Sequence, residues 1–377
     1  MWFPVSVFSS SILFDYCKAF LRSQRSRGVK IKYYSIMAEV KKVCTSKKIG
    51  THNGTFHCDE VLACYMLKQL PEYSHADIIR TRDPKILEQC DVVVDVSGVY
   101  DASKHRYDHH QRSFTGCMQT LTDSQKPWKT KLSSAGLVYL HFGRRVLSQV
   151  MQMPEDHQAL DKVYDKIYEN LIQEVDAIDN GVSQSDEKPR YIITTNLSAR
   201  VGNLNPKWND KNMDEEAQFN KALQLVGGEF MDKVLYYKNS WLPARSLVKG
   251  AVLHRFEVDE SGEIAELAEC GCPWKDHLFD LEKELNIEVP IKFVIYSDNS
   301  GKWRVQCVSV RPQSFENRLG LLEEWRGIRD DALSKLSGIQ GCIFVHATGF
   351  IGGNQTRKGA LEMARKTLQK SREAMET

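Results

Sequence analysis

The sequence lacks a surplus of charge of either sign, a regular framework of cysteines, an internal repeat and a long apolar run. Its 377 residues carry 51 lysines and arginines against 49 aspartates and glutamates, which gives a formal net charge of +2. Such a balance neither favours nor excludes a nucleic-acid partner, because a local basic groove can be hidden in a neutral total. The ten cysteines are scattered along the chain, which is typical of a reduced, intracellular protein.

Acidic residues are nearly absent from residues 1–38, where Asp15 stands alone among six lysines and arginines. Frequent serines and apolar residues at helical spacing are typical of a mitochondrial presequence, with a disordered tail or a signal anchor as the alternatives. The apolar run over residues 1–14 is too short to cross a bilayer, so we expect no membrane span. We assign residues 1–46 to a targeting segment or disordered tail, most of which a start at Met37 would remove.

Strand and helix patterns alternate in the next part of the chain, which predicts an α/β fold with a parallel sheet. We expect strands at 48–51, 76–82 and 90–98, and helices at 57–70 and, briefly, from Pro84. The third strand is nearly continuous in apolar residues, as in a strand covered on both faces. Further helices are expected at 133–151, 158–180 and 214–242, the last interrupted at Gly227-Gly228. These elements make a first domain over residues 47–244.

A second, smaller domain of mixed α/β type is expected over residues 245–377. Strand patterns cover 251–258, 263–269, 291–298 and 302–310, with a hairpin turn at 299–302. Residues 342–353 have the pattern of one apolar strand that ends in glycines, and residues 356–374 that of a final helix. Cys270 and Cys272 precede His277, but no second cysteine pair follows, so a plain loop is favoured over a zinc site.

Carboxylates and imidazoles gather at the predicted strand ends of the first domain and in the loops after them. Because ligands of α/β proteins bind at the carboxyl edge of a parallel sheet, we expect these groups to converge. Mixed oxygen and nitrogen ligands suit manganese, iron or magnesium, and so many ligands favour two metal ions bridged by a carboxylate, an arrangement used in phosphoester hydrolysis. Taken singly, each residue has a plain alternative as a turn residue or a helical ion pair. The candidates are His52, His57, Asp59, Asp95, Asp108, His109, His110, Asp176 and Asp179.

Two short motifs that contain some of these candidates, "YDHHQ" and "VVVDVS", resemble the DHH phosphoesterase superfamily, whose members use a manganese or magnesium pair. With "IGTHNGTFHCDE", "RTRD", "KLSSAGLVYLHFG", "VDAIDNG" and "CIFVHATGFIGG", the chain resembles the melanocyte proliferating gene family from about Ile49 to the final helix. The resemblance implies a DHH-type domain followed by a DHH-associated-like domain. It also implies a 3′–5′ RNA exonuclease that acts on single-stranded 3′ ends in RNA processing, in the mitochondrion (matrix) and the nucleus or nucleolus, with two divalent ions, Mn²⁺ or Mg²⁺.

Carried over by position, the resemblance implies roles for individual residues. Metal ligands would be His52, His57, Asp59, Asp95, as the bridge, and His109, together with Asp176 or Asp179, of which Asp176 is preferred. His110 would serve as proton donor or oxyanion stabiliser, and Asp108 would orient a histidine. Arg106 and Arg112 are candidate phosphate grips, or else solvated loop charges.

In the second domain, glycines before a helix are similar to the substrate motif of the DHH-associated domain. Backbone N–H groups at a helix start can hold a phosphate, although such glycines can also serve backbone geometry alone. Trp208, Trp303 and Trp325 could stack on bases, but packing is the favoured use. Two other functions stay open: hydrolysis of short oligonucleotides or pyrophosphate-type molecules, and RNA binding without catalysis. The candidate substrate residues are His346, Gly352, Gly353, Asn354, Thr356 and Arg357.

Overall fold

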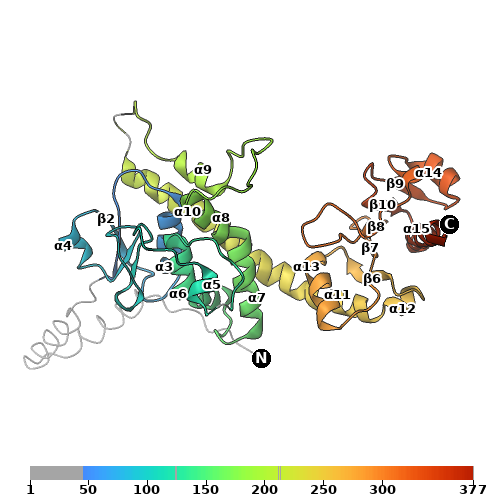
Figure 1. Ribbon diagram of the computed structural model, residues 1–377, viewed down its shortest axis with the longest axis horizontal. Helices are drawn as coiled ribbons and strands as arrows, with labels where there is room; N and C mark the ends of the chain where they lie inside the picture. The colour runs from blue at the N-terminus through green and yellow to red at the C-terminus, as the bar shows by residue number, and fades with distance from the viewer. Residues whose placement is uncertain (1–45, 124, 211, 213, 377) are drawn as a thin grey trace, which may run out of the picture.

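The computed structural model describes residues 46–376 except 124, 211 and 213, so the predicted targeting segment, apart from its last residue, lies outside the described residues. Two lobes, each built around a sheet of five strands, are joined by a long helical stretch (Figure 1). That stretch consists of α10 (Glu215–Tyr236), a π-helical turn η3 (Tyr237–Trp241) and α11 (Leu242–Leu253). The domain division predicted after residue 244 falls inside α11.

The first sheet has the strand order β2-β1-β3-β5-β4. Strands β1 (Lys48–Thr51), β2 (Asp77–Arg80), β3 (Val92–Val94) and β5 (Arg106–Tyr107) are parallel, which confirms the predicted α/β class. Only β4 (Tyr100–Asp101), at the edge, runs antiparallel to its neighbour. The apolar run of β3 has the expected cause, because Val92 and Val94 join one hydrophobic cluster and Val93 joins another on the opposite face.

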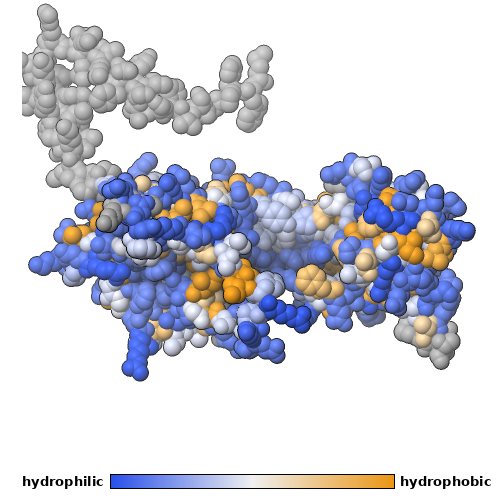
Figure 2. Space-filling view, turned by 90° about the horizontal axis from the view of Figure 1, so that it is seen from above, coloured by the Kyte–Doolittle hydropathy of each residue, from blue (hydrophilic) through white to orange (hydrophobic). Residues whose placement is uncertain are grey.

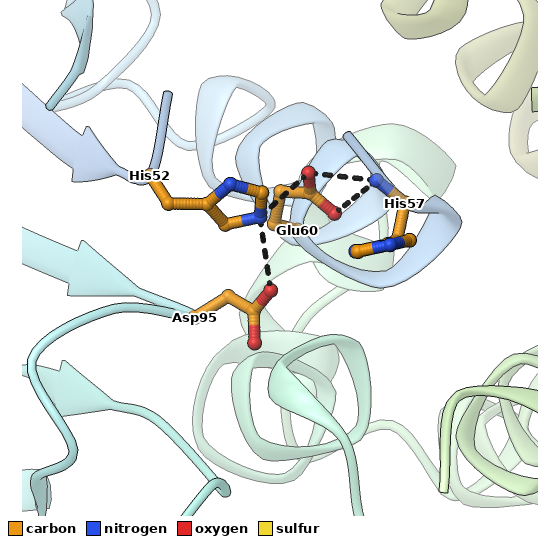
Figure 3. Close-up of side chains that lie close together, drawn as sticks. All are labelled: His52, His57, Glu60 and Asp95. Carbon is orange, nitrogen blue, oxygen red and sulfur yellow. Dashed lines mark hydrogen bonds and ion pairs between the residues drawn. The ribbon is translucent and has the colours of Figure 1, made fainter. Parts of the chain in front are cut away.

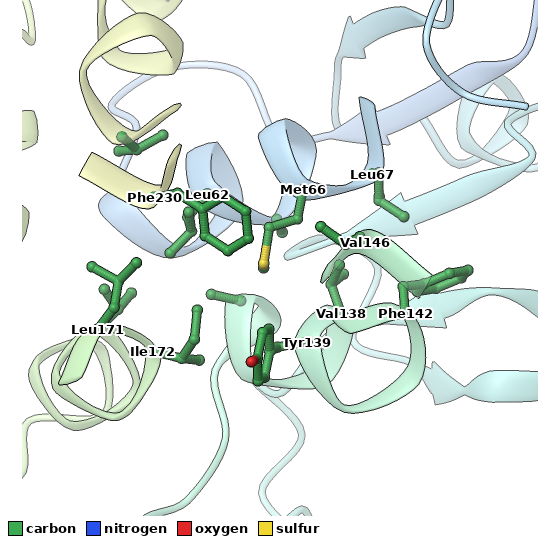
Figure 4. Packing of buried hydrophobic residues seen from close by; sticks show 14 of the residues in the cluster. Leu62, Met66, Leu67, Val138, Tyr139, Phe142, Val146, Leu171, Ile172 and Phe230 are labelled. Atoms are coloured by element: carbon green, nitrogen blue, oxygen red, sulfur yellow. The ribbon is translucent and has the colours of Figure 1, made fainter. Parts of the chain in front are cut away.

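Helices cover the inner face of this sheet and form the main core (Figure 4). They are α3 (Cys58–Lys68), α6 (Ser134–Met151), α7 (Gln158–Ile167), α8 (Gln173–Asp179) and α10. Leu62 and Met66 of α3 meet Val138 of α6, Ile172 and Phe230 in this core. Shorter helices complete the lobe: α4 (Pro84–Leu87), η1 (Ala102–Lys104), α5 (Met118–Leu121) and α9 (Leu197–Gly202).

Two helix predictions in this lobe need correction. The helix expected over residues 158–180 contains a π-helical segment, η2 (Tyr168–Ile172), between α7 and α8. The interruption expected at Gly227-Gly228 is wrong, since α10 runs through both glycines. A side chain at Gly227 would overlap the ring of Tyr65 on α3. This glycine therefore serves the close contact of two helices rather than a break in one.

The second sheet has the order β6-β7-β8-β10-β9 and mixes parallel and antiparallel pairs, as expected. Its strands are β6 (Ile264–Cys270), β7 (Phe293–Ser297), β8 (Trp303–Cys307), β9 (Cys342–Val345) and β10 (Ile351–Asn354). The predicted hairpin between β7 and β8 is confirmed, because the Asp298 N–H donates to the Lys302 carbonyl at 2.7 Å. The lobe also contains α12 (Arg255–Val258), α13 (Lys275–Glu284), η4 (Glu323–Trp325), α14 (Asp330–Ser337) and α15 (Arg357–Glu376).

Two strand predictions in this lobe are wrong. Residues 251–258 are helical in α11 and α12, because Val248, Ala251 and Val252 form one helix face that packs against α13 and β6. Residues 342–353 form two antiparallel strands rather than one. The chain turns between them, where the Gly349 N–H donates to the His346 carbonyl at 2.8 Å and Gly349 takes a φ of +73° that favours glycine.

The surface is largely polar. On the face shown in Figure 2 most exposed residues are hydrophilic, and the hydrophobic ones form scattered patches. Among the helices of the described residues, none combines the length and the apolar content that a bilayer crossing requires. The lobes also touch through charged side chains, since Lys166 of α7 lies 3.2 Å from Asp276 of α13.

Candidate metal centre

The predicted ligands of the first lobe meet at the carboxyl edge of its sheet. His52 directly follows β1, Asp95 follows β3, and His109 lies two residues after β5. The first turn of α3 brings His57 and Asp59 to the same place. Three strand ends and one helix start therefore converge, as expected for a parallel sheet.

One group of donors surrounds the His52 ring (Figure 3). Its Nε2 atom lies 3.1 Å from Glu60 Oε1 and 3.4 Å from Asp95 Oδ2, while Nδ1 faces the Asn53 carbonyl at 3.2 Å. With His57, these residues offer four ligand atoms within 4.8 Å of one another. Such a set can hold one cation with mixed oxygen and nitrogen ligands.

A second group surrounds His109. Its Nε2 atom lies 3.0 Å from Asp179 Oδ2, 3.4 Å from Asp95 Oδ1 and 3.9 Å from Asp59 Oδ2. Asp95, His109 and His110 form one donor set here, and His57, Asp59 and Asp179 form another. Asp95 therefore belongs to two sets and presents one oxygen to each histidine, which is the position that a bridging carboxylate needs.

Negative charge exceeds positive charge in this cluster. Asp59 and Glu60 are fully buried and Asp95 nearly so. The ion pairs of Glu60, Asp59, Asp95 and Asp179 within the described residues are made with histidines and include no lysine or arginine. Asp59 Oδ1 and His109 Nε2 are buried and have no hydrogen-bond partner among the described residues. Divalent cations fit this donor set, since buried charges require a partner.

The pKa values reflect the crowding of like charges. Burial raises the pKa of Asp59 well above its usual range, and the carboxylates of Asp95 and Asp179 add to the effect. Burial also acts to raise the pKa of Asp95, but the approach of His109 and His52 outweighs it and holds that pKa below its usual range. Burial lowers the pKa of both histidines, but their carboxylate neighbours raise it to about 10 for His52 and about 9 for His109. A bound cation would displace these protons.

The backbone and the start of α6 hold Asp95 in place. Asp95 has a φ of +56° and Ser97 one of +92°, a conformation that L-residues rarely adopt and that clusters at functional sites. Ser134 Oγ lies 3.1 Å from Asp95 Oδ1, and the Ser134 N–H donates to Asp59 Oδ2 at 3.3 Å. The positive end of the α6 dipole thus faces the carboxylates.

Asp108, to which the resemblance assigned the orienting of a histidine, contacts His110. Its Oδ1 atom lies 2.9 Å from His110 Nδ1 and accepts the His110 N–H at 3.0 Å, while Oδ2 accepts the Gly98 N–H at 2.6 Å. Asp108 is buried, whereas the side chain of His110 is 62% exposed. His110 therefore faces solvent beside Asp95, from which its Nδ1 lies 3.4 Å.

The structure reverses the preference for Asp176 over Asp179. Asp179 lies at the cluster, beside His109. Asp176 is fully buried one helical turn earlier, where its Oδ1 atom accepts hydrogen bonds from Ser133 N at 2.9 Å, Ser133 Oγ at 2.8 Å and Gly136 N at 3.0 Å. Its oxygens are committed to the start of α6, so Asp176 positions that helix instead of facing a cation.

Three polar residues of the cluster escaped the sequence predictions. Glu60 has a local signal, because it is the third residue of α3 and accepts the His57 N–H at 2.8 Å in a capping box. Ser134 stands at a helix start in "SSAG", a common place for serine. Asn180 was assigned only to a helix end, yet its Oδ1 atom lies 3.2 Å from His109 Nδ1 and fixes that ring.

The two arginines of the first lobe are not part of the cluster. Arg106 donates to the Cys90 carbonyl at 3.2 Å, at the opposite edge of the sheet from Asp95, so the structure does not bring it to the centre. Arg112 is exposed, and its side chain makes no hydrogen bond or ion pair with another described residue. A phosphate-gripping role remains a prediction for Arg112 and has no geometric support for Arg106.

The predicted substrate residues lie in the second lobe, around β10. Gly352 and Gly353 are inside β10, between β8 and β9, so their backbones belong to the sheet rather than to a free loop before a helix. Asn354 is buried and accepts the Thr356 N–H at 2.9 Å, and Arg357 forms an ion pair with Glu266 at 2.6 Å. His346 is exposed. The backbone phosphate site expected at the start of α15 is therefore partly taken by side chains of the chain itself.

The remaining candidates are placed as follows. Trp325 is buried in the core of the second lobe, Trp208 is 96% exposed and Trp303 is half-buried. His277 is buried, with Nε2 2.7 Å from the Trp241 carbonyl. His277 belongs to α13 rather than to a loop, and the choice between a zinc site and free thiols at Cys270 and Cys272 stays a prediction.

Residues 48–368 match the model of a family described as "Uncharacterised protein family (UPF0160)". The chain is 61% identical over 322 residues to the MYG1 exonuclease of Mus musculus, covering 85% of this chain and 84% of that protein. The MYG1 exonuclease of Homo sapiens is 58% identical over 328 residues, 87% of each chain. The MYG1 protein YER156C of Saccharomyces cerevisiae is 43% identical over 332 residues, 86% of this chain and 96% of that protein.

Two solved structures of RecJ also align with the chain. RecJ in complex with Mn²⁺ from Thermus thermophilus is 14% identical, with a TM-score of 0.24 over 86% of this chain and 53% of that one. Exonuclease RecJ bound to manganese is 13% identical, with a TM-score of 0.23 over 88% and 92%. Scores of this size do not establish a common fold.

Proposed function

The chain belongs to the MYG1 family, as its motifs indicated, and from this membership and the geometry of the metal centre we propose that it is a metal-dependent 3′–5′ exoribonuclease. The observation that carries the proposal is the position of Asp95, which is shared by two donor sets and faces two buried histidines. Two divalent cations bridged by a carboxylate activate water and neutralise phosphoryl oxygens. The relatives named as exonucleases support this reaction class.

The donor sets divide the ligands between two positions. His52 and Glu60 would hold one cation, and His109, Asp59 and Asp179 the other. Asp95 would be shared between them, and His57 belongs to a donor set at each position. Mn²⁺ suits this mixture of imidazole and carboxylate, and Mg²⁺ is the alternative with more water ligands.

His110 and Asp108 carry the proton chemistry in this proposal. Asp108 engages His110 Nδ1, which leaves Nε2 of the exposed ring to donate a hydrogen bond to a phosphate oxygen or a proton to the leaving 3′-oxygen. The His110 ring faces solvent beside Asp95, and we propose that an RNA end enters from this side. Asp95, by contrast, is buried, so in this proposal it binds the cations and does not contact the RNA.

An RNA digestion assay tests the proposal. Full-length protein with Mn²⁺ and an RNA labelled at its 5′ end should shorten the RNA one nucleotide at a time, and Asp95→Asn should abolish the reaction. Asp91→Asn is the matched control, since Asp91 lies before β3 at the opposite end and binds Lys47 at 2.6 Å. No nucleotide release, or equal rates in the wild type and Asp95→Asn, would overturn the proposal.

The same assay separates the alternative functions. A strong preference for dinucleotides or pyrophosphate over long RNA would indicate a small-substrate hydrolase. RNA that is bound but never cut would indicate a binding module. Faster digestion of DNA than of RNA would correct the substrate class while keeping the nuclease reaction.

We also propose that residues 1–46 direct the chain to the mitochondrion and that a form starting at Met37 reaches the nucleus. The support is the basic, serine-rich composition of the first 38 residues. Tagged full-length chain and tagged Met37 form should distribute differently in cells, and identical distributions would contradict the targeting proposal.

A further inference from the structure

Helices pack on only part of one face of the second sheet. The opposite face packs on α15, because Phe293, Ile295 and Val305 share a core with Ala360 and Met363. On the other face, α11 and α13 pack on β6 and β7 through Ala265, Leu267 and Val294, and that cluster includes no described residue of β8, β9 or β10. Beyond β7, Arg304 and Phe344 on this side are half-buried and Arg329 is exposed, so a partner can contact them.

The strand register places five residues in one row across this face. Tyr296 pairs with Arg304, Arg304 with Gly353, Gly353 with Phe344, and Phe344 with Arg329. Residues directly opposite one another in neighbouring strands point to the same side of a sheet and lie about 5 Å apart. We call these five residues the aromatic–arginine row.

Two arginines flank one aromatic ring in this row. The guanidinium carbon of Arg304 lies 5.6 Å from the centre of the Phe344 ring, and that of Arg329 lies 5.9 Å from it. A side chain at Gly353 would come within 2.9 Å of both Phe344 and Arg304. The glycine therefore leaves the space in which arginine and ring approach each other.

The charges of the row are only partly neutralised. Arg304 is held by Asp298 at 2.5 Å, whereas the exposed side chain of Arg329 makes no hydrogen bond or ion pair within the described part of the chain. Cations interleaved with aromatic rings are suited to a strand of nucleotides, because the rings stack on bases and the guanidinium groups bind phosphates.

A cavity of about 750 Å³ continues the row at its Tyr296 end. Tyr296 and Gln306 line it from the sheet, where the Tyr296 hydroxyl donates to Gln306 Oε1 at 2.9 Å. Tyr236 and Trp241 line it from the helical stretch between the lobes. Trp241 is buried and its Nε1 has no hydrogen-bond partner among the described residues. The volume falls in the range of ligand pockets.

We propose that the aromatic–arginine row and this cavity bind single-stranded RNA away from the metal centre. Bases stack on Phe344 and on the tyrosines of the cavity, and Arg304 and Arg329 bind the phosphates between them. The proposal rests on the proposed function for the identity of the strand. Side chains of the second lobe would then bind the RNA, and free backbone groups at the start of α15 would not be required.

Fluorescence anisotropy with the full-length protein, without divalent metal so that nothing is cut, tests the surface. The probe is a labelled oligouridylate of about 12 nucleotides, within the range of single-strand site sizes. Phe344→Ala should raise the dissociation constant at least about fivefold, as expected for one lost stacking contact. Arg304→Gln with Arg329→Gln should lower the slope of log affinity against log salt by about 1.4, because two phosphate contacts are lost.

Two further variants separate the surface from general charge and folding effects. Gly353→Ala changes no charge but forces Arg304 and Phe344 apart, and should weaken binding. Arg365→Gln removes one charge from α15, on the other side of the sheet, where Arg365 binds Asp259 at 2.7 Å, and should leave binding unchanged.

The outcomes distinguish this proposal from the proposed function. If the wild type cuts RNA with Mn²⁺ but the double arginine variant and Phe344→Ala bind RNA as tightly as Arg365→Gln, the surface is wrong and the nuclease stands. If polyglutamate displaces the RNA as well as unlabelled RNA does, the row is a general anion surface and the proposal fails. A wild type that binds RNA at the row without cutting it contradicts the nuclease alone.

Discussion

The carboxylate of Asp176 makes the stability of the first lobe depend on pH in a direction that can be measured. Asp176 is fully buried and accepts four hydrogen bonds, three from Ser133 and Gly136 and one from the Tyr168 hydroxyl at 3.2 Å. Burial raises its pKa to about 7, and the hydrogen bonds from Ser133, Tyr168 and Gly136, which lower the pKa, do not cancel the effect of burial. Asp176→Asn is the test, because asparagine keeps one acceptor oxygen for the start of α6 and cannot ionise.

The sign of the effect follows from proton binding. The folded-state pKa of Asp176 lies above the value of 3.8 for an unperturbed aspartate. At pH values between these two pKa values, the folded state therefore binds more protons than the unfolded state. Its contribution to the free energy of unfolding therefore falls as the pH rises through that window and levels off above a pH of about 7. From about pH 5 to about pH 8 the loss is roughly 2–3 kcal/mol, using 1.36 kcal/mol for each unit of pKa shift.

Urea unfolding followed by tryptophan fluorescence gives the required free energies. All other titrating groups are common to both proteins, so the difference in unfolding free energy between the wild type and Asp176→Asn isolates this carboxylate. The free energy of unfolding of Asp176→Asn minus that of the wild type should increase by roughly 2–3 kcal/mol from about pH 5 to about pH 8. A difference that stays constant across this range would refute the account of Asp176 as a buried, high-pKa carboxylate at the start of α6.

Three further predictions concern packing and the metal centre. Gly227→Ala should destabilise the protein by about 1–3 kcal/mol in urea unfolding, because the new methyl group meets Tyr65. In the control Gly228→Ala the methyl group meets nothing within 4 Å, so this variant should be more stable than the wild type by up to about 1 kcal/mol. Equal effects of the two substitutions would contradict the packing of α10 on α3. Ser134→Ala should weaken Mn²⁺ binding roughly tenfold in calorimetry, as loss of a residue that orients a ligand does, and Ser134→Thr should retain the binding if the hydroxyl is what matters. Asp179→Asn should weaken Mn²⁺ binding at least tenfold, and unchanged affinity would remove Asp179 from the ligands.

The local patterns predicted β1, β2 and β3 of the first sheet and the edge where the polar groups meet, but not β4 or β5. His52, Asp95 and His109 each follow a strand of a parallel sheet, and the chemistry of such an edge is general. The choice between Asp176 and Asp179 could not be made in this way. Both lie on the same face of α8, and only the packing of α6 decides which carboxylate accepts hydrogen bonds from a helix start and which faces the cluster.

Other features depended on contacts between distant segments. Residues 251–258 look like a strand in the sequence, but the packing of Val248 and Val252 on α13 and β6 makes that region helical. Arg106 stands two residues from Asp108 in the sequence, yet the register of β5 directs its guanidinium group to the Cys90 carbonyl at the opposite edge. The aromatic–arginine row likewise cannot be recognised from the sequence, because Tyr296, Arg304 and Phe344 come together only through strand register.

The number of manganese ions bound to the full-length chain tests the central claim most directly. The shared position of Asp95 between donor sets on His52 and on His109 predicts two ions for each wild-type chain, measured by metal analysis after equilibrium dialysis. Asp95→Asn should retain at most one weakly bound ion, while Asp91→Asn should retain both. One ion or none in the wild type, or two ions in Asp95→Asn, would contradict the account of a bridged metal pair.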